Sequence, residues 1–196
     1  MTERQSALFR GVRSRDVIRT LMELHFPRAK GIADLWGKGA FWFGGELVLG
    51  LDIEPRLGCA VRADAQAVPL RYHAVDVAVF DPPFTWSRGR NPGSTMLHKD
   101  FSYLARYEDL YRLLAEAAKE CRRIARLGAI VKIADSVKHG RYHAVHADVL
   151  SLFGAEALDD IAILDSMVVR PDGPNWGEQR HLRNTHSFFL VFKWQK

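Results

Sequence analysis

The sequence predicts an α/β fold with a mostly parallel sheet, and three observations lead to this prediction. Short apolar runs alternate with segments of helical periodicity, which is typical of parallel strands joined by helices on both faces of a sheet. Four successive apolar runs end in a carboxylate, and ligands of open α/β sheets bind at the carboxyl ends of the strands. The last two runs have no helical segment between them, so we expect an antiparallel hairpin at one edge of the sheet.

Each expected element has its own local signal. Residues 14–25 have a helical pattern, and residues 31–42 indicate a short buried strand followed by a glycine turn. The next apolar runs predict strands over 46–51, 59–62 and 75–80, and the four runs lead to Asp34, Asp52, Asp64 and Asp81. Residues 101–127 contain a long amphipathic helical pattern that we expect to end at Gly128. The remaining segments predict a strand over 128–134, a helix over 142–158, and strands over 161–169 and 187–194.

Asp81-Pro82-Pro83-Phe84 is the most informative motif, because its chemistry suits an exocyclic amino group. Such an amine is a poor nucleophile, since its lone pair is delocalised into the ring, and two acceptors on its N–H groups favour a pyramidal nitrogen. The Asp81 carboxylate and the Pro82 carbonyl are candidate acceptors, held in place by a rigid proline turn. Phe84 would stack on the base, which is worth about 1 to 3 kcal/mol in single-stranded nucleic-acid sites. The structural alternative is a proline turn that closes a buried strand, with Asp81 capping it.

With these residues the chain resembles the class I S-adenosylmethionine-dependent methyltransferases, and within them the amino-methyltransferases of nucleic-acid bases. Asp34, Gly37 and Gly39 look like the methionine-binding motif, Asp52 like the acid that binds ribose, and Asp64 like the residue that meets the cofactor adenine. The resemblance implies that Asp81, Pro82, Pro83 and Phe84 are catalytic. The residues implied in cofactor binding are Phe26, Asp34, Leu35, Trp36, Gly37, Gly39, Asp52, Ile53, Asp64, Ala65 and Asp81.

The resemblance covers nearly the whole chain, including the last apolar run over residues 186–192. It implies a Rossmann-like, seven-stranded sheet in the order 3-2-1-4-5-7-6, with helices on both faces and an antiparallel hairpin at the C-terminus. The chain departs from the family after Gly39, where Ala40, Phe41 and Trp42 stand in place of a third glycine.

Two long irregular stretches, over residues 85–100 and 170–185, are expected to contact nucleic acid. Their cationic and aromatic side chains suit phosphate contacts and base stacking. The candidate contact residues are Trp86, Arg88, Arg90, Lys99, Trp176, Arg180 and Arg183. The alternatives are a solvated charged loop for the first stretch and, for the second, a hairpin tip whose tryptophan packs on its own strands.

The histidines at positions 139, 143 and 146 could gather on one helical face as metal ligands. Methyl transfer from a sulfonium needs no metal, and no cysteine lies nearby, so we expect a surface helix start and no metal site. Asp135 follows the fifth strand and is expected either to line the pocket or to cap the next helix.

Length and composition favour one domain, and the resemblance implies that residues 1–196 form a single methyltransferase domain without a separate target-recognition domain. The chain has 196 residues, of which 47% are hydrophobic, and a formal net charge of +5, which is consistent with a polyanionic partner. We expect a cytoplasmic protein, because the sequence shows no signal peptide or membrane-length apolar run and both cysteines lie in apolar segments.

The function predicted from the sequence is S-adenosylmethionine-dependent methylation of an exocyclic amino group in DNA, with adenine N6 as the first choice. Sequence specificity would reside in the two loops or in a partner subunit or homodimer, or the specificity would be low. The alternatives are methylation of an RNA base, methylation of cytosine N4, or a noncatalytic nucleic-acid-binding module. A dinucleotide oxidoreductase would share the glycine turn and Asp52 but has no use for the proline motif.

Overall fold

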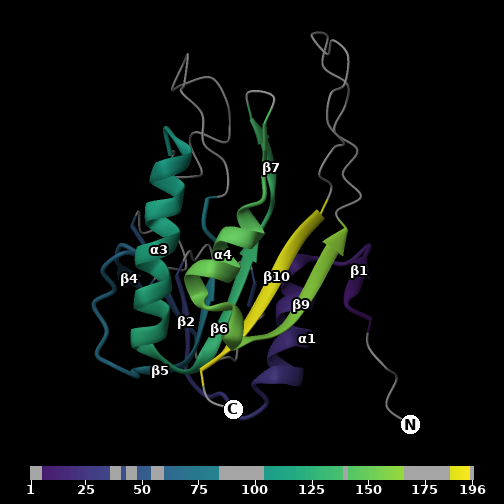
Figure 1. Ribbon diagram of the computed structural model, residues 1–196. Helices are drawn as coiled ribbons and strands as arrows, with labels where there is room; N and C mark the ends of the chain where they lie inside the picture. Colours follow the sequence, from purple (N-terminus) through teal and green to yellow (C-terminus); the bar gives the residue numbers. More distant parts are fainter. Residues whose placement is uncertain are drawn as a thin grey trace.

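The computed structural model of this chain describes residues 6–35, 41–42, 48–53, 60–83, 104–138, 141–165 and 186–194. They form an eight-stranded sheet with helices on both faces (Figure 1). The helices are α1 (Ser14–His25), α3 (Tyr107–Ile124), α4 (Val145–Phe153) and the short 3-10 helix η1 (Ala155–Ala157). The sheet strands are β1 (Leu8–Arg10), β2 (Ile32–Asp34), β3 (Val48–Asp52), β4 (Val61–Arg62), β5 (Val75–Phe80), β6 (Ala125–Ile133), β9 (Leu158–Asp165) and β10 (His186–Lys193).

The strand order is β4-β3-β2-β5-β6-β10-β9-β1, and only β10 runs antiparallel to its neighbours. If β1 is left aside and the other seven strands of this sheet are numbered 1 to 7 in chain order, starting from β2, the row reads 3-2-1-4-5-7-6. This confirms the class I methyltransferase fold predicted from the sequence, including the terminal antiparallel pair β9 and β10. Strand β1, which the sequence did not predict, adds an eighth, parallel strand beside β9.

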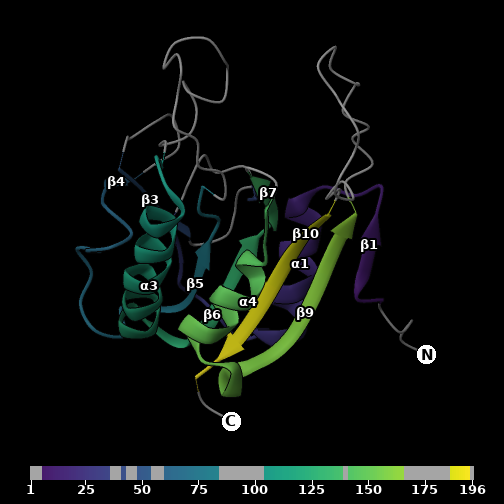
Figure 2. The ribbon, with the colours of Figure 1, turned by 45° about the horizontal axis from the view of Figure 1, so that its top comes forward.

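Helices cover the sheet from both sides because each has one apolar face (Figures 1 and 2). On one face α1 buries Val17, Ile18 and Leu21 in a cluster with side chains of β5, β6 and β10. On the other face α3 buries Leu110 and Leu114, together with further residues one turn apart, against β5, β6 and α4. Fully burying one such leucine contributes roughly 1.5 to 3 kcal/mol, so both layers fasten the sheet.

The expected end of the long helix at Gly128 is wrong. Helix α3 ends at Ile124, and Gly128 lies inside β6, opposite Lys193 of β10. A Cβ at this position would collide with the carbonyl oxygen of Phe192 and crowd the Phe26 ring. The glycine therefore permits a close approach between strands and does not mark a helix end.

The helix expected over 142–158 is also shorter than predicted. Its first residues instead form β8 (Arg141–His143), which pairs with β7 (Ser136–Lys138) in a small antiparallel hairpin. The hairpin rises beyond the carboxyl edge of the central strands (Figure 1). Its short, mostly polar strands carry no apolar periodicity, which is why the sequence did not reveal it. No helix within the described part of the chain is long and apolar enough to cross a membrane.

Candidate functional site

A cavity of about 240 Å³ lies at the carboxyl edge of the sheet, between the ends of β2, β3, β4 and β5 and the start of α3. Parallel strands bring their carboxyl ends to one edge, which is why residues far apart in the sequence meet there. Six residues predicted to bind cofactor or to be catalytic line this cavity: Leu35, Asp52, Ile53, Asp64, Ala65 and Pro83.

Asp34 and Asp52 end neighbouring parallel strands and are both buried, with 1% and 5% of their surface exposed. The Asp34 carboxylate accepts a hydrogen bond of 3.0 Å from the indole N–H of Trp42. Trp42 lies where the sequence departs from the motif that it resembles, and this bond ties Trp42 to the end of β2. Asp52 lines the cavity directly, and its carbonyl accepts the Ala63 N–H at 2.9 Å.

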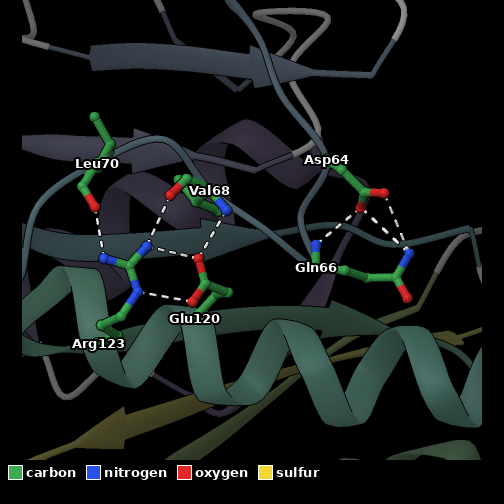
Figure 3. Close-up of polar contacts among 6 residues, drawn as sticks. All are labelled: Asp64, Gln66, Val68, Leu70, Glu120 and Arg123. Carbon is green, nitrogen blue, oxygen red and sulfur yellow. Dashed lines mark hydrogen bonds and ion pairs between the residues drawn. The ribbon is translucent and has the colours of Figure 1, made fainter.

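Asp64 stands at the start of a tight turn, and its carboxylate is held by Gln66 (Figure 3). The Gln66 backbone N–H donates to Oδ1 of Asp64 at 2.8 Å, and the Gln66 side-chain amide lies 3.3 Å from both carboxylate oxygens. The turn closes with a 3.0 Å bond from the Ala67 N–H to the Asp64 carbonyl. Gln66 also lines the cavity, and no sequence pattern pointed to it, because this contact needs the turn geometry.

Helix α3 clamps the segment that follows this turn through Glu120 and Arg123 (Figure 3). Arg123 donates to the carbonyls of Val68 and Leu70 at 2.7 and 2.5 Å, while Glu120 accepts the Val68 N–H at 2.7 Å. The two side chains also bind each other, at 2.6 and 2.7 Å. The hydrogen bond from Arg123 lowers the pKa of Glu120 against the opposing effect of burial. The clamp thus anchors one wall of the cavity to the helix.

Asp81 directly follows β5, and the two prolines after it are buried. Its Oδ2 lies 3.0 Å from the ammonium of Lys132 on the adjacent strand β6, in an ion pair whose side chains are 17% and 15% exposed. Burial raises the pKa of Asp81, while the charge and hydrogen bond of Lys132 act in the opposite direction. Lys132 was not foreseen, because a single lysine within an apolar strand is not a motif.

Asp135 caps α4, which is one of the two roles considered for it. Its Oδ1 accepts the backbone N–H of His146 at 3.1 Å and lies 2.7 Å from Nδ1 of the same residue, while the Tyr142 hydroxyl donates to Oδ2. The His146 ring also stacks on Phe188, and the His143 ring lies against Tyr107. Among the described residues, no group of three or more side chains is arranged to hold a metal ion.

Phe26 does not take part in the cavity, contrary to its predicted place beside the cofactor. Phe26 is buried near the start of β6, against Gly128. The ammonium Nζ of Lys193 lies 5.9 Å from the centre of the Phe26 ring. This is the amino edge of the sheet. Because α1 leads into the start of β2, its C-terminal end lies on the side of the sheet away from the cavity (Figure 1).

The remaining predicted site residues lie outside the described part of the chain. They are Trp36, Gly37, Gly39, Phe84, Trp86, Arg88, Arg90, Lys99, Trp176, Arg180 and Arg183.

Neither family models nor curated proteins give a match to the sequence. Among solved structures, the chain is similar to a candidate DNA modification methylase from Thermus thermophilus in complex with S-adenosylmethionine, at 16% identity and a TM-score of 0.39. The alignment covers 67% of this chain and 53% of that protein, so the chain spans about half of its length.

Two further neighbours have 13% identity and a TM-score of 0.48: an S-adenosylmethionine-dependent methyltransferase from Thermotoga maritima and a protein from Pyrococcus horikoshii. The alignments cover 91% of this chain and 87% and 88% of theirs. These similarities are distant, and the strand order described above is what identifies the fold.

Proposed function

We propose that the chain is an S-adenosylmethionine-dependent methyltransferase whose acceptor is an exocyclic amino group of a nucleic-acid base, with adenine N6 of DNA as the first choice. One observation carries the proposal. Asp81-Pro82-Pro83 leads from the end of β5 into the cavity that Asp52 and Asp64 also line. The motif for an amino acceptor and the residues for an adenosyl cofactor thus share one edge of the sheet.

The cavity suits an adenosyl cofactor in its polar groups and its apolar lining. The Asp52 carboxylate is an acceptor for ribose hydroxyls, and the turn of Asp64 and Gln66 offers polar groups for the edge of an adenine ring. The aliphatic side chains of Ile53 and Ala65 line the same cavity, where they would contact the faces of a flat ring. Asp34, with Gly37 and Gly39, is proposed to complete the methionine end.

When bound, the cofactor supplies an electrophilic methyl group on a sulfonium. The chain's own residues then have the task of alignment: Asp81 and the Pro82 carbonyl accept the amine N–H groups and point the nitrogen lone pair at the methyl carbon. The N–C bond forms as the C–S bond breaks, sulfur keeps the bonding electrons, and the nitrogen then releases one proton. Phe84 is proposed to stack on the base, which in a duplex first has to leave the stack.

Nucleic acid is proposed to lie over the carboxyl edge of the sheet. The candidate contacts remain the cations and aromatics of the two loops, and the β7–β8 hairpin adds the exposed Arg141 and the half-exposed Tyr142 at the same edge. The excess of basic residues supports a polyanionic partner. Specificity would come from these elements or from a second subunit, with residues 1–196 acting as one domain.

Product analysis tests this proposal directly. The purified protein is incubated with labelled S-adenosylmethionine and either DNA or RNA, and the digested nucleosides are separated by mass spectrometry. N6-methyladenine in DNA is the expected product. N4-methylcytosine alone would change the base but keep the mechanism, and label in RNA alone would change the substrate. No label in either polymer would overturn the proposal.

A further inference from the structure

The Asp81 carboxylate, proposed above to receive the target amine, already has a cation beside it. Strands β5 and β6 run parallel, with Phe80 opposite Val131, so the next residues of the two strands, Asp81 and Lys132, are neighbours. Their charged groups are 3.0 Å apart and both side chains are largely buried. The ion pair therefore belongs to the edge of the sheet where the reaction is proposed to occur.

Lys132 is held in this position from more than one side. Its ammonium lies 5.5 Å from the centre of the Phe41 ring, within the range of a cation–π contact. Its backbone is in the middle of the sheet: Lys132 is directly opposite Phe189 on β10, and the preceding residue, Val131, is opposite Phe80 on β5. A cation fixed in this way cannot leave Asp81 as easily as a surface lysine leaves a solvated partner.

We propose that Lys132 determines which amines the site accepts, by reserving Asp81 for a neutral amine and rejecting cationic alkylamines. The inference rests on the proposed function and narrows its substrate class. A carboxylate alone in a partly buried site attracts ammonium groups, whereas a second ammonium beside Lys132 would meet like-charge repulsion that little water screens. The exocyclic amine of adenine or cytosine is neutral, so it can donate to Oδ1 while Lys132 remains at Oδ2.

The same ion pair has a second measurable consequence. Because burial raises the pKa of Asp81 and Lys132 counteracts this, removing the lysine charge should raise that pKa further. Asp81 acts as an acceptor only when it is ionised, so activity is lost as the pH falls through its pKa. The acid limb of the pH–rate profile of Lys132→Met should therefore lie at higher pH than that of the parent.

Binding of n-butylammonium tests the selectivity without relying on turnover. The protein is saturated with S-adenosylhomocysteine and titrated with n-butylammonium chloride, with sodium chloride as the ionic-strength control. We expect weak binding to the parent and to Lys132→Arg, and binding at least about tenfold tighter to Lys132→Met. Lys193→Met is the matched control, because Lys193 forms a 2.6 Å ion pair with Asp159 at the opposite edge of the sheet. It should behave like the parent.

The methyl-transfer assay completes the test and separates the two proposals. With a base substrate, n-butylammonium should inhibit Lys132→Met at far lower concentrations than it inhibits the parent. If Lys132→Met is unfolded by circular dichroism, Lys132→Gln replaces it, since glutamine retains a hydrogen-bond donor without the charge. A folded neutral variant that matches the parent in amine binding and in its acid limb would overturn the inference. A parent that methylates no base, while its amine binding responds to Lys132 as expected, would overturn only the proposed function.

Discussion

Carboxylates lie at both edges of the sheet, but they have different surroundings at the two edges. At the amino edge, His25 of α1 lies between two carboxylates of β9: its Nδ1 is 2.8 Å from Oδ2 of Asp159, and its Nε2 is 3.0 Å from Oδ2 of Asp160. The ammonium of Lys193 on β10 lies 2.6 Å from the same oxygen of Asp159. These contacts fasten a helix to two strands. At the carboxyl edge, by contrast, Asp52 and Asp64 line a cavity and Asp81 lies at the entry to the proline motif.

The difference indicates that position in the sheet, and not residue type, separates the carboxylates that form ion pairs between elements from those proposed to bind ligand. At the amino edge, helix C-termini lead into the strands, as α1 leads into β2 and α3 into β6. Phe26, which follows α1, is buried there against Gly128. At the carboxyl edge, the end of β4 leads into the turn at Asp64, and ligands of open α/β sheets bind outside such strand ends. Substitutions at the two edges should therefore affect different measurements.

Asp81→Ala should have the largest effect. Without an acceptor for the amine protons, methyl transfer should be abolished. Affinity for S-adenosylhomocysteine should stay within a few fold of the parent, because the main contact proposed for Asp81 is the target amine, although the resemblance also places it among the cofactor-binding residues. Label transfer and calorimetric titration measure the two quantities. Asp159→Ala is the control from the other edge and should retain turnover. Near-normal transfer by Asp81→Ala would end the amine-activation argument.

Asp52→Ala should come next. Loss of the proposed acceptor for both ribose hydroxyls should weaken S-adenosylhomocysteine binding by about 1 to 3 kcal/mol. Calorimetry gives the affinity, and thermal unfolding without ligand checks the fold. If affinity is unchanged in a folded Asp52→Ala protein, this buried carboxylate does not belong to the cofactor site.

Glu120→Gln tests whether the clamp on α3 positions the cavity wall. The variant loses the charge that binds Arg123 and the Val68 N–H, so we expect faster hydrogen exchange over residues 64–70 and cofactor affinity lower by about 1 kcal/mol. Glu116→Gln is a matched control, because Glu116 forms an exposed i,i+3 pair with Lys119 on the same helix. Equal exchange in the two variants would mean that the clamp does not order the wall.

The smallest effect is expected at the amino edge, from Asp159→Asn. The hydrogen bond from Lys193 is the main cause of the lowered pKa of Asp159, so its folded value lies below its unfolded one. The stabilisation is then complete at neutral pH and is lost as the pH falls through the folded pKa. We expect a loss of about 0.5 to 1 kcal/mol in the free energy of unfolding at neutral pH, discounted for partial exposure. The difference from the parent should vanish in acid, with methyl transfer unaffected at neutral pH.

The sequence by itself determined where the main strands end and which acids follow them. Asp34, Asp52, Asp64 and Asp81 were found from local apolar runs, because burial imposes a pattern on a few consecutive residues. The resemblance of the proline motif then implied the strand order that the structure has. Helix α1 was also predicted with its observed bounds, since its apolar spacing depends only on its own residues.

Only the tertiary structure decided which side chains meet. Lys132 reaches Asp81 across 51 positions, and Arg123 reaches Val68 across 55, because strand pairing and helix packing bring them together. The same packing took Phe26 to the amino edge, placed Gly128 inside a strand and paired β1 with β9. None of these contacts leaves a local pattern, since a lysine in a strand or a glutamate on a helix has the same sequence signal whether or not it has a partner.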